Sequence, residues 1–324
     1  MGRDGCVAPH RVLFQIVNGR TFHYILAAAL LMSVFAARGQ SHTLYAASVR
    51  SGGTNADVPI AGNLYTVNLA NGSATLVGAI RLPGAKAVGV TGMAFHPQTG
   101  VLYGITSEQS PNSPHALVTI DASSGAATLV GDLALVGSDL AFDPKGTLYV
   151  WMQGTSQLGT IDVSSAKVTP VGRGGPPGPP AGIAIDPQGM VYVTAKGASG
   201  TLDNVDLVSG ALQVGPPLTG APFSTQINSM SFSPSGLLLA VNSNGGSPAN
   251  TRLVAINTAT GAVAAIGPLP DDTDALAFFG YAGSNLAPTF LSMSPGGRVV
   301  TIVLTIVLLG VAAQIIFQRH GGGS

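Results

Sequence analysis

Two short patterns of apolar and polar positions alternate along the middle of the chain. The first reads LYTVNLANGSATLVG at 64–78 and returns at 117–131, 158–172, 202–215 and 253–267. The second reads MAFHPQTGVLYGIT from Met93 and returns from Leu140, Ile183 and Met230, with a shortened copy, ALAFFG, from Ala275. In both patterns, apolar segments of strand length flank a polar turn. Each pattern therefore predicts a β-hairpin, and one copy of each together predicts a unit of four strands.

The turn residues support this interpretation. In the first pattern an Asn or Asp that can bond turn amides is followed, a few residues later, by a Gly that tolerates positive φ. These pairs are Asn68 and Gly72, Asp121 and Gly125, Asp206 and Gly210, and Asn257 and Gly261. The third copy has Ala166 at the glycine position, so its turn is expected to be strained or differently shaped. The second pattern carries Pro97, Pro144, Pro187 or Pro234 to pre-set φ, and Asp143 and Asp186 are expected to cap their turns.

The spacing of the repeats selects an all-β propeller. The four turn prolines are 47, 43 and 47 residues apart, which suits a four-stranded propeller blade and is too long for a leucine-rich or hexapeptide solenoid. The segment TLYAAS at 43–48 has the pattern of a second strand without a first, and 275–280 has that of a first strand without a second. Pairing them would close a ring of five blades and remove its exposed edges.

The repeats resemble exported bacterial propellers of the NHL and YVTN type. In the LYTVNLANGSATLVG pattern they also resemble Gly-rich propeller domains of unknown function in bacterial surface proteins. The resemblance spans roughly residues 43–280. It implies a fold and leaves the function open.

The N-terminal residues 1–39 have the pattern of a signal peptide. Arg3, Arg11 and Arg20 precede an apolar run at 24–36, which is too short to span a bilayer and ends in small residues suited to signal peptidase. An uncleaved N-terminal anchor is the alternative. The predicted propeller then occupies 40–280.

The C-terminal part has the pattern of a membrane anchor. A Gly- and Pro-containing linker at 281–298 leads to an uncharged stretch that begins at Val299 and ends at Phe317, long enough to cross a bilayer as a helix. Arg319 lies in the short tail 318–324, expected on the cytoplasmic side, which places the propeller outside. The alternative is a buried helix of the soluble domain.

The same tail resembles the C-terminal sorting signals of exosortase-type systems, in which a Pro-Thr-Leu-Ser-like motif precedes an apolar helix and a basic end. Here Pro288 and Thr289 are followed by an additional Phe290 before Leu291 and Ser292. The resemblance implies cleavage by a sorting protease and delivery to the cell surface or matrix. A permanent anchor is the alternative.

Composition excludes some classes of function. Only 9% of residues are charged and the formal net charge is zero, so no basic stripe is expected and nucleic acid is not an expected partner. The single cysteine, Cys6, precedes the first apolar run, so the predicted propeller carries no disulfide and no thiol chemistry.

Few residues offer catalytic or metal-binding chemistry. His42, His96 and His115 lack partners at metal-ligand spacing, and His96 is expected in a turn. The only glutamate, Glu108, is expected to be a solvated loop acid, and a glycosidase would need a second acid near it. The cluster Asp271, Asp272 and Asp274 is expected to be a solvated turn, with a Ca²⁺ site as the alternative.

Two further features have a structural and a functional interpretation. Trp151 is expected to pack in the core, with an exposed platform for sugar stacking as the alternative. The segment GRGGPPGPPAG at 172–182 is expected to be a surface connection between the third and fourth blades, and polyproline recognition is the alternative.

These patterns predict a non-catalytic, exported propeller that binds a protein or glycan ligand. It would be membrane-anchored or sorted to the surface, with no catalytic residue, metal or cofactor assigned. Two alternatives stay open. One is a propeller hydrolase or lyase acting on polysaccharide or lactone, and the other is a structural matrix or envelope protein.

Overall fold

A computed structural model describes residues 42–49 and 62–280, apart from 177, 179, 180, 196, 247 and 248. The expected signal peptide at 1–39 lies outside these residues. So do the linker at 281–298, the membrane segment from Val299 to Phe317 and the tail at 318–324.

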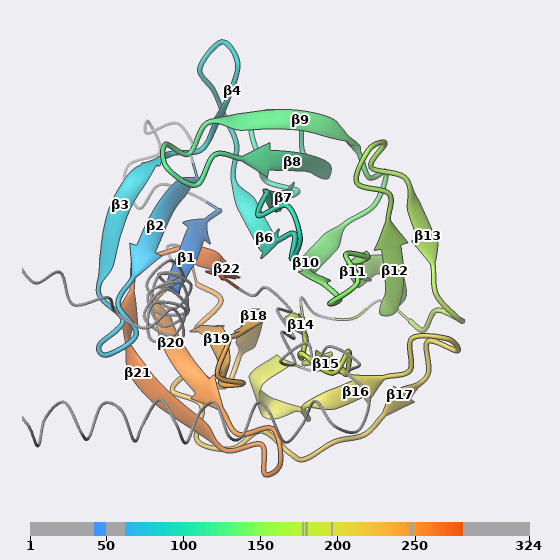
Figure 1. The fold of residues 1–324 in the computed structure, drawn as a ribbon. Helices are drawn as coiled ribbons and strands as arrows, with labels where there is room; N and C mark the ends of the chain where they lie inside the picture. The colour runs from blue at the N-terminus through green and yellow to red at the C-terminus, as the bar shows by residue number, and fades with distance from the viewer. Residues whose placement is uncertain are drawn as a thin grey trace, which may run out of the picture.

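The described residues form five four-stranded antiparallel sheets arranged as blades around a central channel (Figure 1). From the axis outward, blade 1 contains β22 (Thr273–Phe279), β1 (Thr43–Ser48), β2 (Asn63–Val67) and β3 (Ala74–Ala79). Blade 2 contains β6 (Val90–Phe95), β7 (Leu102–Thr106), β8 (Ala116–Ile120) and β9 (Ala127–Asp132). Blade 3 contains β10 (Gly137–Phe142), β11 (Leu148–Met152), β12 (Gln157–Ile161) and β13 (Val168–Pro170).

Blade 4 contains β14 (Ile183–Ile185), β15 (Val191–Val193), β16 (Asp203–Val205) and β17 (Leu212–Gln213). Blade 5 contains β18 (Gln226–Phe232), β19 (Leu238–Ser243), β20 (Thr251–Ile256) and β21 (Val263–Leu269). Two 3₁₀ turns, η1 (Gln153–Thr155) and η2 (Gly197–Ser199), lie in loops of blades 3 and 4. A small hairpin of β4 (Arg81–Leu82) and β5 (Lys86–Ala87), which the sequence patterns did not predict, protrudes between blades 1 and 2.

The predicted closure of the ring is confirmed. β1 pairs antiparallel with β22, with Leu44 opposite Phe278 and Ala46 opposite Leu276. Blade 1 is therefore built from both ends of the described chain. The prediction of five four-stranded blades is also confirmed.

The predicted turns are confirmed as well. In the first hairpins, the side-chain Oδ1 of Asp121, Asp162 and Asp206 accepts a serine hydroxyl and backbone N–H groups of its own turn. These hydrogen bonds, the hydroxyl first for Asp121 and Asp162 and the backbone N–H first for Asp206, lower the pKa of each carboxyl. Ala166 adopts φ +59° and keeps the turn that glycine forms elsewhere, because its N–H donates to the carbonyl of Asp162 at 2.8 Å. The third turn is thus strained but not differently shaped.

The hydrophobic core lies between blades rather than inside one layer. Each blade packs both faces against its neighbours, so every residue of β10 and β11 is buried, whereas the outer strand β9 is largely exposed. This explains why the inner strands lack a polar face in the sequence. Five apolar clusters alternate with the five blades around the ring.

The glycine that ends the first pattern lets neighbouring blades approach closely. A Cβ on Gly267 of blade 5 would lie 1.7 Å from the carbonyl oxygen of Asn71 in a turn of blade 1. A Cβ on Gly78 of blade 1 would likewise lie 2.2 Å from the carbonyl of Ser124 in blade 2. The repeated glycine is therefore required by contact between blades.

Replacing Gly267 by Ala should lower the free energy of unfolding by about 3 kcal/mol, because backbone on both sides must move to make room for the methyl group. Urea denaturation of the full chain measures this. Gly154→Ala is the control, since a Cβ there meets no atom within 4 Å. Equal stability of the two variants would contradict the role assigned to this glycine.

Candidate functional site

The inner strands of all blades run in the same direction along the channel. Their first residues therefore lie together at one end of the channel and their last residues at the other. The last residues of β6, β10, β14, β18 and β22 enclose an apolar cavity at one end. The first residues of β6, β10, β18 and β22 line a polar cavity at the other end. We call the second cavity the polar mouth.

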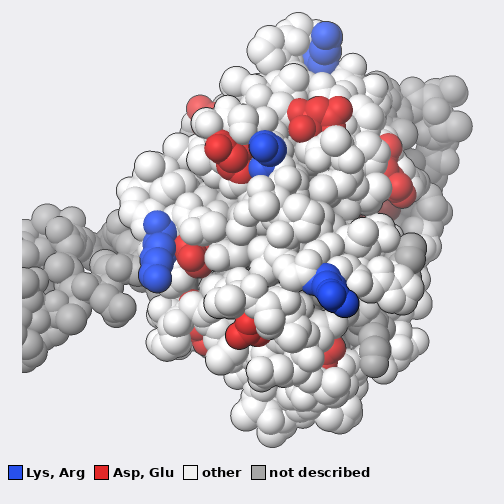
Figure 2. Space-filling model, turned by 90° about the vertical axis from the view of Figure 1, so that its right-hand side faces the viewer, with Lys and Arg blue, Asp and Glu red and all other residues white. Residues whose placement is uncertain are grey.

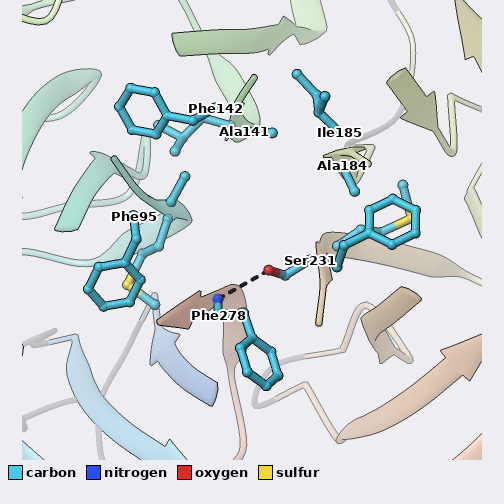
Figure 3. Close-up of a pocket in the computed structure, with 12 residues that line it drawn as sticks. Phe95, Ala141, Phe142, Ala184, Ile185, Ser231 and Phe278 are labelled. Atoms are coloured by element: carbon cyan, nitrogen blue, oxygen red, sulfur yellow. Dashed lines mark hydrogen bonds between the residues drawn. The ribbon is translucent and has the colours of Figure 1, made fainter. Parts of the chain in front are cut away.

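The apolar end leaves little free space. Phe95, Phe142, Ile185 and Phe278 surround the cavity there with their side chains turned outward, away from its centre, and the backbone N–H of Phe278 donates to Oγ of Ser231 in the next blade at 3.1 Å (Figure 3). The cavity between them measures only about 40 Å³. It has room for a few water molecules at most and offers no space for a ligand.

Between the two ends, one buried carboxyl group connects three blades. The backbone N–H groups of Ile183 in blade 4 and Met230 in blade 5 donate to Oδ2 of Asp139 in blade 3, at 3.1 and 3.0 Å. The hydroxyl of Ser229 donates to Oδ1 at 3.0 Å. Oγ of Ser229 also accepts the N–H of Leu276 in blade 1 at 3.0 Å. The side chain of Asp139 is fully buried.

At the matching repeat positions, Gly92 of blade 2 makes room for this carboxyl and Gly182 of blade 4 makes room for the chain at Met230. A Cβ on Gly92 would lie 2.9 Å from Oδ1 of Asp139 and 2.7 Å from its Cα. A Cβ on Gly182 would lie 2.8 Å from Cγ of Met230. The axis therefore holds one acid where the neighbouring blades carry glycine.

Burial raises the pKa of Asp139 well above its usual range, while hydrogen bonds from backbone N–H groups and from Ser229 act in the opposite direction. The neutral, protonated form is thus stabilised in the folded protein relative to an unfolded chain. A raised folded-state pKa means that stability falls as pH rises from about 4 toward that pKa.

Asp139→Ala should lower the free energy of unfolding by about 4 kcal/mol, because it leaves two buried N–H groups and a buried hydroxyl without their acceptor. Asp139→Asn should retain the fold, since its amide oxygen can accept both N–H groups and its amide nitrogen can donate to Ser229. Relative to wild type, the Asn variant should gain stability as pH rises from 4.5 to 8. Urea denaturation at both pH values measures this, and an Asn variant as unstable as the Ala variant would contradict it.

The polar mouth gathers side chains from several blades. Its volume is about 150 Å³. It is lined by Val49 of blade 1, Thr91, Ser107, Glu108 and Gln109 of blade 2, Val136, Gly137, Ser138 and Gln153 of blade 3, Gln226 and Asn228 of blade 5, and Asp274 of blade 1. Only blade 4 contributes no described residue to this lining.

Asp274 is held at the mouth by two neutral donors. The hydroxyl of Thr91 donates to its Oδ2 at 2.7 Å, and Nδ2 of Asn228 donates to its Oδ1. Burial raises the pKa of Asp274 to about 6, and the negative charge of Asp272 adds to this increase. The side chain stays partly accessible from the cavity. Its charge can therefore change near neutral pH.

The hydroxyl of Ser138 makes no hydrogen bond to the described part of the protein. Its side chain is 3% exposed and lines the polar mouth, yet its Oγ has no hydrogen-bond partner among the described residues. A buried hydroxyl without a partner is costly to a fold. Because Ser138 also lines the cavity, its hydroxyl is a candidate for hydrogen bonding to a bound molecule.

The sequence-predicted acids are distributed unevenly. Glu108 is an exposed loop residue, as expected, but the loop places it at the same mouth as Asp274. The expectation that Asp271, Asp272 and Asp274 form a solvated turn is wrong for two of the three. Asp271 is exposed, but Asp272 is buried, with its Oδ1 accepting the N–H of Ala249 at 2.9 Å, and Asp274 is half-buried at the mouth because neighbouring blades pack around both. Within residues 42–49 and 62–280, as far as they are described, no three His, Cys, Asp or Glu side chains converge as a metal site.

The other predicted residues have structural roles. Nδ1 of His96 accepts the N–H of Gln98 at 3.2 Å, and Oδ1 of Asp143 and Asp186 accepts N–H groups of their turns, so all three are turn caps as predicted. Trp151 is buried between blades 3 and 4, which confirms core packing and excludes an exposed sugar platform. His42 contacts the ring of Phe278, and His115 lies in the β7–β8 loop with φ +56°.

The connection at 172–182 lies between β13 and β14, as predicted. The N–H of Gly175 donates to the carbonyl of Thr155 at 2.6 Å, which holds this part of the connection against the η1 turn.

Sequence reasoning missed Asp139, Ser138 and Asn228. A signal for Asp139 was present, because the aligned positions in the other inner strands carry Gly92, Gly182, Ser229 and Ala275, all small. A single acid among small residues at the start of an apolar strand marks a buried polar role. Ser138 and Asn228 carry no comparable signal.

Charges on the surface are sparse. Figure 2 shows one face, on which Lys and Arg lie as separate groups among neutral residues rather than as a stripe. Of the helices in the described part of the chain, none is long and apolar enough to cross a membrane.

Comparison with known proteins finds similar solved structures but shows no family for the chain. No protein-family model matches the chain, and no curated protein matches it. A chain in the crystal structure of a nidogen/laminin complex is similar, with 12% sequence identity, a TM-score of 0.47, and coverage of 74% of this chain and 98% of that chain. A protein of unknown function from Bacteroides caccae is similar with 13% identity, a TM-score of 0.45, and coverage of 74% and 99%.

A further protein of unknown function, from Bacteroides thetaiotaomicron VPI-5482, has 14% identity and a TM-score of 0.41, with coverage of 57% of this chain and 51% of that chain. These likenesses name no function for this chain. Its function has to be inferred from its own side chains.

Proposed function

We propose that this protein is a non-catalytic binding module, exported and held at a membrane or cell surface, that binds a small polar ligand at the polar mouth. The observation that carries the proposal is the unpartnered hydroxyl of Ser138, buried beside a cavity of about 150 Å³ to which four blades contribute. Small-molecule sites are typically concave and use a few well-placed polar groups to orient the ligand.

The rigidity of the site supports binding. Thr91, Asn228 and Asp274 come from three neighbouring blades, and Thr91 and Asn228 each donate a hydrogen bond to Asp274. The hydroxyl of Thr91 also lies 3.3 Å from the carbonyl oxygen of Ser138 in a further blade. Because the blades are fixed by their packing, these groups keep their positions without a ligand, which reduces the entropy lost on binding.

Ser138→Ala tests this proposal directly. Calorimetric titration of the full chain with neutral hexoses, amino sugars, uronic acids and amino acids should find saturable binding of at least one class, weakened about tenfold by the variant through loss of a buried hydrogen bond. The melting temperature should not fall, because Oγ of Ser138 bonds to no described protein group and its removal breaks no hydrogen bond of the fold. Asp271→Asn, exposed and outside the mouth, is the control. Failure of every class to bind would refute the proposal.

A hydrolase is the second candidate, because Glu108 and Asp274 share the polar mouth. Glu108 is exposed and Asp274 has its pKa raised to about 6, and two carboxyls in unlike surroundings can divide the roles of base and acid. Under this alternative, a polysaccharide or lactone is hydrolysed and both Glu108→Gln and Asp274→Asn abolish turnover. Binding without turnover favours the first proposal. A surface phenotype without any saturable ligand would favour a structural matrix protein.

Export and anchoring are proposed from the two apolar segments at the ends of the sequence. Intact mass of the protein from its host should show loss of the first 36 to 39 residues, in agreement with a cleaved signal peptide. Product in the medium that also lacks everything after about Pro288 would indicate a sorting protease. Product in the membrane that retains Val299 to Phe317 would indicate a permanent anchor, and a full-length cytoplasmic product would contradict export.

A further inference from the structure

The charges at the polar mouth restrict what it can bind. Two of the described lining residues, Glu108 and Asp274, carry carboxyl groups, and none of the twelve is Lys, Arg or His. The remaining lining groups include Ser, Thr, Asn and Gln side chains, which supply hydroxyl and amide oxygens. An anionic ligand would meet repulsion there, whereas a cationic ligand would meet unbalanced negative charge.

Asp274 has no counter-ion of its own among the groups that set its ionisation. Both of its hydrogen-bond donors, Thr91 and Asn228, are neutral, and the nearby charge that acts on it is the negative charge of Asp272. A partly buried carboxylate without an opposite charge is poorly stabilised. A positive group in the mouth would supply the missing partner.

The kind of cation follows from the other lining groups. Ca²⁺ takes six to eight oxygen ligands and is bound mainly through several carboxylates, but no group of three such side chains exists among the described residues. Quaternary ammonium groups are bound by aromatic cages, and no aromatic side chain lines the polar mouth. A primary ammonium, with three N–H donors, matches a site of carboxylates and neutral oxygens.

The unpartnered hydroxyl of Ser138 indicates which second polar group the ligand carries. Its Oγ can both donate and accept and has no partner of its own among the described residues, and Ser138 lines the same cavity as Asp274. A hydroxyl on the ligand would satisfy it. A cavity of about 150 Å³ suits a molecule of the size of one sugar ring rather than a polymer.

We infer that the polar mouth selects a small hydroxylated primary amine, whose ammonium group faces the carboxylates of Asp274 and Glu108 and whose hydroxyl bonds to Ser138. This inference rests on the proposed binding function and adds the chemical class of the ligand.

The test uses three probes of similar shape that differ in one group: glucosamine, glucose and glucuronate. In calorimetric titrations of the full chain at pH 7, glucosamine should bind at least tenfold more tightly than glucose, because a charge-assisted hydrogen bond replaces a neutral one. Glucuronate should bind most weakly. Glucose binding as tightly as glucosamine, or glucuronate binding best, would overturn the inference while leaving a binding module in place. Failure of all three probes overturns the inference, and the wider ligand panel then decides the proposed function separately.

Variants locate the ammonium group. Glu108→Gln and Asp274→Asn should each weaken glucosamine about tenfold and change glucose little, since only the charged probe uses the carboxylates. Glu108 is an exposed loop residue, so its variant should fold even if Asp274→Asn does not. Asp271→Asn removes a nearby negative charge outside the mouth and should leave both affinities unchanged. An equal loss of affinity for glucosamine with Asp271→Asn would mean that the amine is attracted by the overall negative charge of the protein rather than by the carboxylates at the mouth.

The pH dependence gives an independent readout. Glu108 lines the same mouth, and the charged group that acts on Asp274 is Asp272 on its own chain segment; the pKa of Asp274, about 6, means that it is mostly protonated at pH 5. Glucosamine should therefore bind about tenfold more weakly at pH 5 than at pH 7. Asp274→Asn should remove most of this dependence. A wild-type affinity that does not change with pH would contradict the role of Asp274.

Discussion

The carboxyl group of Asp139 resolves a problem that every small propeller ring creates at its axis. The innermost strand of each blade has one edge without a neighbouring strand, and its backbone N–H groups point toward the channel with no partner in the same sheet. Unpaired buried N–H groups are expensive. Asp139 accepts two of them, from blades 4 and 5, and through Ser229 it is connected to a third from blade 1. One side chain thereby ties four of the five blades at the point where they converge.

The same arrangement divides the channel into two chambers with different properties. On one side, a mainly apolar lining encloses only about 40 Å³. On the other, hydroxyl, amide and carboxyl groups leave about 150 Å³. The packed apolar end and the buried Asp139 support the polar mouth from below, so the side chains that line the mouth keep their positions. A binding site can then be changed at the mouth without disturbing the packing between blades.

Most of the fold could be predicted from the sequence because it depends on local chemistry. The turn at Asp121 and Gly125 repeats with little variation, and the half-hairpins at 43–48 and 275–280 predicted their own pairing. The polar mouth could not be predicted in the same way. Thr91 and Asp274 lie 183 positions apart, and only the register of two blades brings their side chains together. Likewise, Glu108 could be recognised as a loop acid, but not as a neighbour of Asp274.

The pairing of β1 with β22 also determines when the ring can form. During synthesis the first strand of the described chain has to wait without its inner neighbour until residues 273–279 have been made, because no other segment of the described chain completes blade 1. Contacts between such distant segments form slowly and leave unpaired strand edges exposed for longer. The ring therefore stays open until its last repeat has been made, and the closing strand β22 completes it as the final step.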